Sequence, residues 1–131
     1  MKIQESAENY LETILILKQR QGQVRSIDIV NELNFSKTSV SVAMKKLRES
    51  GLIEMAPDGM ITLLPEGMRI ATTIYERHVL LSQYLIRLGV DPKVAAEDAC
   101  RIEHVISEES FGKIKAHAEQ YTSSADGSDE K

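Results

Sequence analysis

A turn between two short apolar segments limits the folds open to this chain more than any other feature of its sequence. The turn, Ala56-Pro57-Asp58-Gly59, separates residues 52–55 from residues 60–63, and both segments have the length and composition of short strands. It comes directly after a helical stretch that begins at Ser36 and stops at Ser50-Gly51. A helix that is stopped by glycine and followed by a tight hairpin is typical of a winged helix-turn-helix.

The spacing of apolar residues predicts helices on both sides of this hairpin. The expected helices cover residues 6–20, 26–33, 36–49, 65–88, 92–106 and 107–118. We therefore expect a mainly α fold with one small β-hairpin, in which an N-terminal winged helix-turn-helix over residues 1–64 is followed by a helical domain over residues 65–120. Residues 121–131 are rich in Ser, Asp and Gly without an apolar period, which predicts a disordered tail.

Charge is distributed unevenly along the chain. The formal net charge is −4 overall, but residues 1–50 carry +2 and residues 51–131 carry −6. The expected helix after Ser36 has Lys37, Lys45, Lys46 and Arg48 and no acid before Glu49, as expected of a helix that enters a DNA groove.

The exposed face of that helix gives the candidate DNA contacts. Hydroxyl and ammonium groups suit backbone phosphates, which we assign to Ser36, Ser41, Lys45 and Lys46. Methyl and hydroxyl groups suit base edges, which we assign to Thr38, Ser39 and Val42, with Lys37 beside them. The alternative is that this face of the helix is only solvated and does not contact DNA.

Cys100, Glu103 and His104 form the sharpest local pattern. Offsets of three and four residues place all three on one face of the expected helix. Thiolate, carboxylate and imidazole are the common side-chain ligands of first-row transition metals. One helix cannot fill the coordination sphere, so further ligands must come from elsewhere. The candidates are His78 on the preceding helix and, on the first helix, Glu12 with Asn9 or Glu8.

Other interpretations of these residues remain open. Each side chain alone would more often be structural, a lone Cys being a small core hydrophobe. A Cys100–His104 nucleophile–base pair is a weaker alternative, because no oxyanion loop, third orienting group or phosphate-binding glycine loop is present. The single cysteine, the lack of an apolar signal segment and the lack of an apolar run near about 20 residues favour a cytoplasmic protein with no membrane contact.

With these residues laid out, the chain resembles the diphtheria-toxin-repressor and manganese-transport-regulator family of metal-dependent bacterial repressors, in its short two-domain form. The resemblance rests on residues 7–14, the winged helix, Arg77-His78 and residues 99–107, Ala-Cys-Arg-Ile-Glu-His-Val-Ile-Ser. It implies a homodimer whose helical domain mediates dimerisation, and a palindromic DNA operator that controls metal-uptake genes.

The resemblance also implies a ligand set for Fe²⁺ or Mn²⁺, with Zn²⁺ or Co²⁺ binding in vitro. The family's ligand positions fall on Asn9, Glu12, His78, Cys100, Glu103 and His104. Asn9 departs from the residues usual at its position, Cys100 is the iron-type residue and Glu12 is the manganese-type residue. Regulation by an organic ligand or a protein partner, with Cys100 and His104 structural, is the alternative function.

Overall fold

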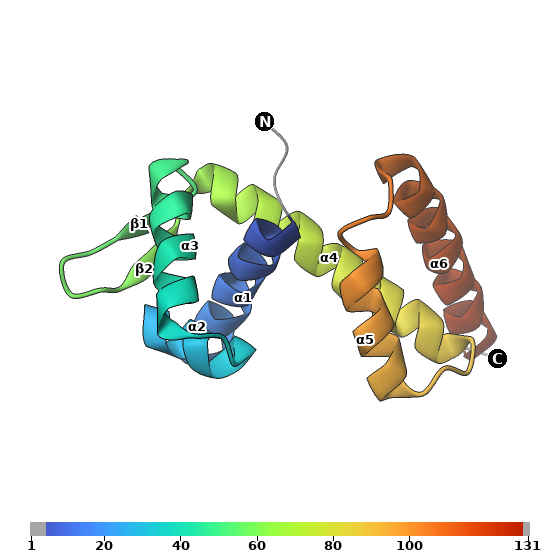
Figure 1. Ribbon diagram of the computed structural model, residues 1–131. Helices are drawn as coiled ribbons and strands as arrows, with labels where there is room; N and C mark the ends of the chain where they lie inside the picture. Colours follow the sequence, from blue (N-terminus) through green and yellow to red (C-terminus); the bar gives the residue numbers. More distant parts are fainter. Residues whose placement is uncertain (1–4, 130–131) are drawn as a thin grey trace. The chain divides into compact units, whose positions relative to one another are not determined.

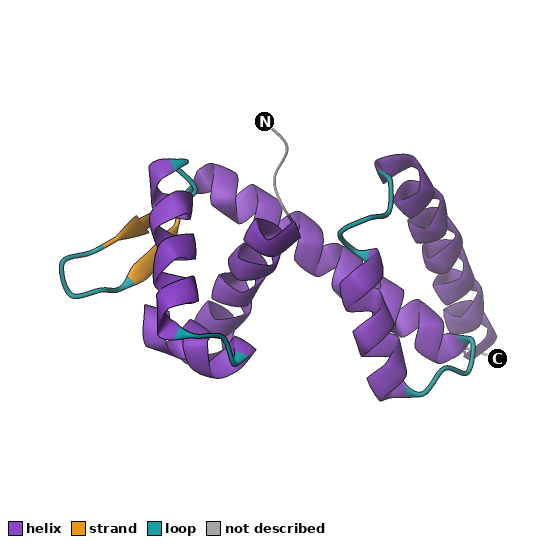
Figure 2. Ribbon diagram, viewed as in Figure 1, coloured by secondary structure: helices purple, strands orange, loops and turns teal. Residues whose placement is uncertain are grey.

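The computed structural model describes the backbone of residues 5–129 and the side chains of residues 5–120 (Figures 1 and 2). Six helices and two strands make up this part of the chain. They are α1 (Glu5–Gln21), α2 (Ser26–Leu33), α3 (Lys37–Glu49), β1 (Ile53–Met55), β2 (Ile61–Leu63), α4 (Pro65–Arg87), α5 (Pro92–Ile102) and α6 (Glu108–Asp129). The mainly α fold with one small hairpin is therefore confirmed.

The chain forms two compact units, which divide between Tyr75 and Glu76. This division falls within α4, whereas the sequence predicts a domain boundary before it. The reason is that the first half of α4 contributes Ile70 and Ala71, 7% and 0% exposed, to the core of the first unit.

Helices α1, α2 and α3 enclose the core of the first unit. Leu11, Ile14, Ile29 and Val40 are fully buried there, and Met44 is 1% exposed. In α2 and α3 one apolar stripe faces inward and the other face is left to solvent, whereas α1 is buried on every side from Tyr10 to Leu15.

Capping residues fix where these helices begin and end. The Ser36 side chain accepts a hydrogen bond from the Ser39 amide at 3.0 Å, as the sequence predicts for the start of α3. At α2 the N-cap is Arg25, whose amide donates to Asp28 Oδ2 at 2.8 Å. Asn34, at φ 58°, ends α2 in the left-handed conformation.

The β1–β2 hairpin is the wing. Its strands pair antiparallel, with Ile53 opposite Leu63 and Met55 opposite Ile61. The Ile61 amide also donates to the Val24 carbonyl at 2.8 Å, which attaches the wing to the start of α2. Behind the wing, α4 packs closely on the chain leaving α3. A Cβ at Gly67 would lie 3.0 Å from the Leu52 carbonyl carbon and closer still to its oxygen, so this position requires glycine.

The second unit holds a smaller core between α4, α5 and α6, built on Leu81, Ala99 and Phe111. Asp91 caps α5, since its side chain accepts hydrogen bonds from the Lys93 and Val94 amides. None of the helices described in residues 5–129 has the length and apolar character needed to cross a membrane.

Two helix ends differ from the sequence predictions. The helix expected over residues 92–106 ends at Ile102. The last helix continues to Asp129, through residues predicted to be a disordered tail. That stretch contains no proline, and a helix already formed gains one hydrogen bond with each residue added. The side chains of 121–131 and the backbone of 130–131 lie outside the described residues.

Candidate metal centre and DNA-binding surface

Three potential ligands converge at the end of α5, in the second unit. One donor atom each from Cys100, Glu103 and His104 lies within 4.8 Å of the other two. The Glu103 side chain is fully buried, the His104 side chain is 3% exposed and Cys100 is exposed. The convergence expected from the sequence spacing is present, with a mixed sulfur, oxygen and nitrogen donor set.

Glu103 is the centre of this group. Its Oε2 lies 2.9 Å from Nδ1 of His78, which projects from α4, so a fourth potential ligand meets the same carboxylate. Its Oε1 has no hydrogen-bond partner among the described residues, although His104 Nε2 lies 3.4 Å away. A buried carboxylate oxygen without a partner is destabilising in a folded protein. The atom is therefore suited to a cation, and the neighbouring donors fit a first-row divalent ion.

Arg77 binds the chain where it leaves α5. Its Nη1 donates to two carbonyl oxygens, those of Glu103 and Ile106, each at 3.1 Å. Its guanidinium also lies over the Phe111 ring, 5.4 Å from the centroid. Binding the carbonyls at the end of α5 stabilises the turn over residues 103–106 in place of a further helical turn. The helix thus stops at Ile102, and His104 belongs to the turn.

The other expected ligands belong to the first unit. Glu12 and Asn9 both lie on α1, where Glu12 is 5% exposed and Asn9 is half-buried. The Asn9 carbonyl oxygen accepts a hydrogen bond from the Thr13 hydroxyl at 2.8 Å. Glu8, the alternative to Asn9, is also half-buried on this helix.

The third helix presents the predicted DNA-binding surface. All eight residues assigned to DNA from the sequence are exposed, whereas Val40, Met44 and Leu47 of the same helix are buried. The exposed residues are Ser36, Lys37, Thr38, Ser39, Ser41, Val42, Lys45 and Lys46. Val42 is 49% exposed, so its methyl groups are accessible on this surface.

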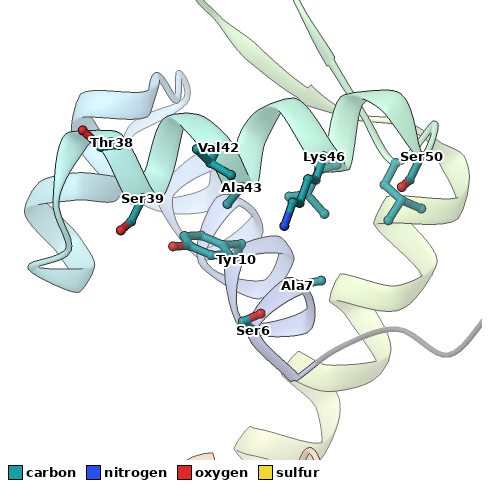
Figure 3. A pocket seen from close by; sticks show the side chains of 11 residues that line it. Ser6, Ala7, Tyr10, Thr38, Ser39, Val42, Ala43, Lys46 and Ser50 are labelled. Carbon is teal, nitrogen blue, oxygen red and sulfur yellow. The ribbon is translucent and has the colours of Figure 1, made fainter.

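A hollow of about 480 Å³ separates one side of this surface from the start of α1 (Figure 3). Val42 and Lys46 point into it from α3, and Ser6, Ala7 and Tyr10 line it from α1. Burial raises the pKa of the Tyr10 phenol above its ordinary value. Among the residues that line the hollow, Lys46 is the charged side chain.

Arg77 is the residue whose role sequence reasoning missed. It stands beside His78 in the stretch that carries the resemblance, but its position on an amphipathic helix gives no sign that it holds distant carbonyl oxygens. Only the fold brings residue 77 to the end of α5.

The fold and these side chains define a winged-helix DNA-binding protein with a second, metal-binding helical unit. Comparison with protein families agrees over nearly the whole chain. Residues 2–61 match the iron dependent repressor N-terminal DNA binding domain, and residues 64–130 match the iron dependent repressor metal binding and dimerisation domain. The chain therefore belongs to the iron-dependent repressor family, as the sequence predicts. By family it is a metal-dependent, DNA-binding transcriptional repressor and not an enzyme.

Named relatives agree with this assignment. The transcriptional regulator MntR of Salmonella typhimurium is 34% identical over 122 residues, covering 93% of this chain and 78% of the relative. The HTH-type transcriptional regulator MntR of Listeria monocytogenes is 36% identical over 110 residues, covering 83% of this chain and 77% of the relative. A solved manganese-dependent transcriptional repressor in complex with manganese superposes with a TM-score of 0.78 at 28% identity. The match covers 86% of this chain and 52% of that one, so this chain spans about half its length.

Proposed function

We propose that this chain acts in the cytoplasm as a homodimer. When a divalent metal ion is bound, the dimer binds a palindromic operator and so represses metal-uptake genes. The proposed ligands are oxygen, nitrogen and sulfur donors from α1, α4 and the end of α5. They are Asn9, Glu12, His78, Cys100, Glu103 and His104. The observation that carries the proposal is the buried Glu103 carboxylate, with one oxygen unpartnered and three other donors around it.

The donor set favours Fe²⁺ or Mn²⁺, and the thiol of Cys100 favours iron of the two. Thiolate is a soft ligand, and affinity for such a site rises from Mn²⁺ to Fe²⁺ and Co²⁺. The family takes its name from iron dependence, whereas the solved relative named above is manganese-dependent. Zn²⁺ and Co²⁺ are expected to bind in vitro for the same reason.

A ligand set drawn from both units would couple metal occupancy to DNA binding. A bound ion would supply a positive charge that several ligand atoms contact at once. His78, Cys100, Glu103 and His104 belong to the second unit, while Glu12 and Asn9 belong to the unit that carries α3. If donors of both units held one ion, α1 would be tied to the second unit, and the position of α3 in the dimer would be fixed with it. Reciprocity follows, since whatever factor metal adds to DNA affinity, DNA adds to metal affinity.

The dimer sets the geometry of the operator. Two copies of α3 related by a two-fold axis read half-sites about 34 Å apart, one turn of B-DNA. The match of residues 64–130 to a dimerisation domain supports pairing through the second unit, which also exposes four large apolar side chains that a partner copy can cover. They are Ile86, Leu88, Val94 and Val105.

Two sets of side chains on α3 are proposed to contact DNA, one at the backbone phosphates and one at the base edges. Lys45 and Lys46, with Ser36 and Ser41, are proposed to hold backbone phosphates. Thr38, Ser39 and Val42 are proposed to meet base edges, the Val42 methyls fitting a thymine methyl group. No Arg or Gln stands among them to read guanine or adenine bidentately, so affinity should depend strongly on salt.

The site is tested by replacing His78 with Ala in the full chain. The His78→Ala protein should still fold and dimerise, but should bind less metal and lose the metal-dependent part of its DNA affinity. Bound metal is measured after dialysis against Mn²⁺ under anaerobic conditions, and DNA affinity with and without a chelator. The DNA is a duplex selected by the wild-type protein from a random-sequence pool.

His117→Ala is the matched control, because His117 lies in the same unit with its Nδ1 3.0 Å from the Tyr84 hydroxyl, on the exposed surface. This variant should match the wild-type protein in both assays. Equal metal binding and equal metal dependence in the His78→Ala and His117→Ala proteins would exclude His78 from the site.

A further inference from the structure

The wing of this protein has no basic residue of its own. Residues 51–64 contain Glu54 and Asp58 but neither Lys nor Arg. A hairpin that bears only acids repels the phosphates of a DNA backbone beside it. A wing that contacts DNA therefore needs a cation from another part of the fold.

Arg25 meets that need. It precedes the first turn of α2, and its Nε donates to the Asp58 carbonyl oxygen at 3.2 Å, while Nη2 lies 3.5 Å from Asp58 Oδ2. The other carboxylate oxygen, Oδ1, accepts a hydrogen bond from the Met60 amide at 3.0 Å and closes the turn. The guanidinium is thus held against the tip of the wing at two atoms, and the Asp58 charge is balanced.

Most of the guanidinium remains available. Arginine carries five N–H donors, and the contacts with Asp58 occupy Nε and Nη2 only. The Arg25 side chain is 42% exposed. Its backbone is fixed by the Asp28 side chain and by the neighbouring bond between the Val24 carbonyl and the wing. An arginine held in this way loses little conformational entropy when its free N–H groups bind a phosphate.

We propose that Arg25 is the phosphate-binding residue of the wing: Asp58 orients its guanidinium, and the remaining N–H groups bind one DNA backbone phosphate per subunit. This inference rests on the DNA binding proposed above and adds a contact outside α3. Each dimer would hold two phosphates in this way.

Arg25→Gln separates phosphate binding from support of the wing. Its side-chain amide keeps an N–H donor for the wing but removes the charge. Since the logarithm of affinity falls with the logarithm of salt by about 0.9 per phosphate, losing two contacts should reduce the slope by about 1.8. Between 0.05 and 0.2 M salt, the wild-type protein should therefore lose about 12-fold more affinity than the variant. The probe is the selected duplex with Mn²⁺-loaded protein, and thermal unfolding is recorded for both proteins.

Arg20→Gln is the control, because Arg20 pairs with Glu32 at 2.8 Å near the other end of α2 and is also exposed. It should keep the wild-type slope. If Arg25→Gln keeps the wild-type slope as well, or only its stability changes, Arg25 merely supports the wing and the inference is overturned. If the wild-type protein itself shows no metal-dependent DNA binding, the proposed function fails first and the inference with it. Should Arg25→Gln fold poorly, Arg25→Lys retains the charge and should restore most of the slope.

Discussion

Replacing Glu103 with Gln should change the stability of the metal-free protein and that of the metal-loaded protein in opposite directions. The Glu103 side chain is fully buried and its Oε1 has no hydrogen-bond partner in the described part of the chain. Such an atom destabilises a fold by about 1 to 3 kcal/mol. The hydrogen bond with His78 at 2.9 Å can survive in the variant, but as a neutral bond it is weaker by about 1 kcal/mol. The amide can also donate toward His104 Nε2, which lies 3.4 Å from Oε1.

The balance predicts that metal-free Glu103→Gln protein is as stable as the wild type or up to about 2 kcal/mol more stable. With metal bound, the wild-type protein should be the more stable of the two, because the neutral amide of the variant is a poor ligand. At a free metal concentration 100 times the dissociation constant, the wild-type protein should gain about 2.7 kcal/mol and the variant much less. Urea unfolding at one fixed protein concentration, with a chelator or with Mn²⁺, measures both differences.

Glu76→Gln provides the comparison, since Glu76 is an exposed acid in the same unit that pairs with Lys115 at 2.9 Å. Its response to metal should equal that of the wild type. The reasoning is refuted if Glu103→Gln is destabilised by more than about 2 kcal/mol without metal and keeps the full gain with it. The carboxylate would then be a structural group.

Further variants test the fold and the DNA surface. Gly67→Ala should destabilise the protein by about 1 to 3 kcal/mol in urea unfolding because its Cβ overlaps backbone, while Gly112→Ala, with nothing within 4 Å, should stabilise α6 by about 0.5 to 1 kcal/mol. The hydrogen bond from Arg20 lowers the pKa of Glu32, so this pair stabilises the fold above the ordinary Glu32 pKa of 4.5 and stops doing so as the pH falls through the lowered value. Arg20→Ala should therefore lower stability slightly at pH 7 and not at pH 2, and equal losses at both pH values would exclude this cause. Lys45→Gln should reduce the salt slope of DNA binding by about 1.8 per dimer, and an unchanged slope would remove Lys45 from the phosphate contacts.

The sequence predicted the winged helix closely because each of its boundaries has a local chemical cause. Ser36 caps α3, Gly51 follows its end at φ 76°, and residues 56–59 form the turn of the hairpin. The prediction of residues 26–33 for α2 matches its observed bounds, and Asp28, which binds the amide of Arg25, makes that residue the cap. Signals of this kind act over a few residues and are visible without the fold.

Long-range contacts explain what the sequence could not predict. Helical spacing brought Cys100, Glu103 and His104 together as expected, but the end of α5 depends on Arg77, more than twenty residues earlier in the chain. The role of Arg25 likewise follows from its contact with Asp58 across the fold. Nothing in the spacing of the sequence connects these pairs.

In the proposed function, one site binds a divalent metal and thereby raises DNA affinity. The most direct test is an anaerobic titration of chelator-stripped protein with Fe²⁺, Mn²⁺ and Zn²⁺, recording bound metal and affinity for the selected duplex in the same samples. We expect one or two ions per subunit, and a rise in DNA affinity that follows occupancy. Tight metal binding that leaves DNA affinity unchanged, or full DNA affinity in the presence of a chelator, would contradict the account.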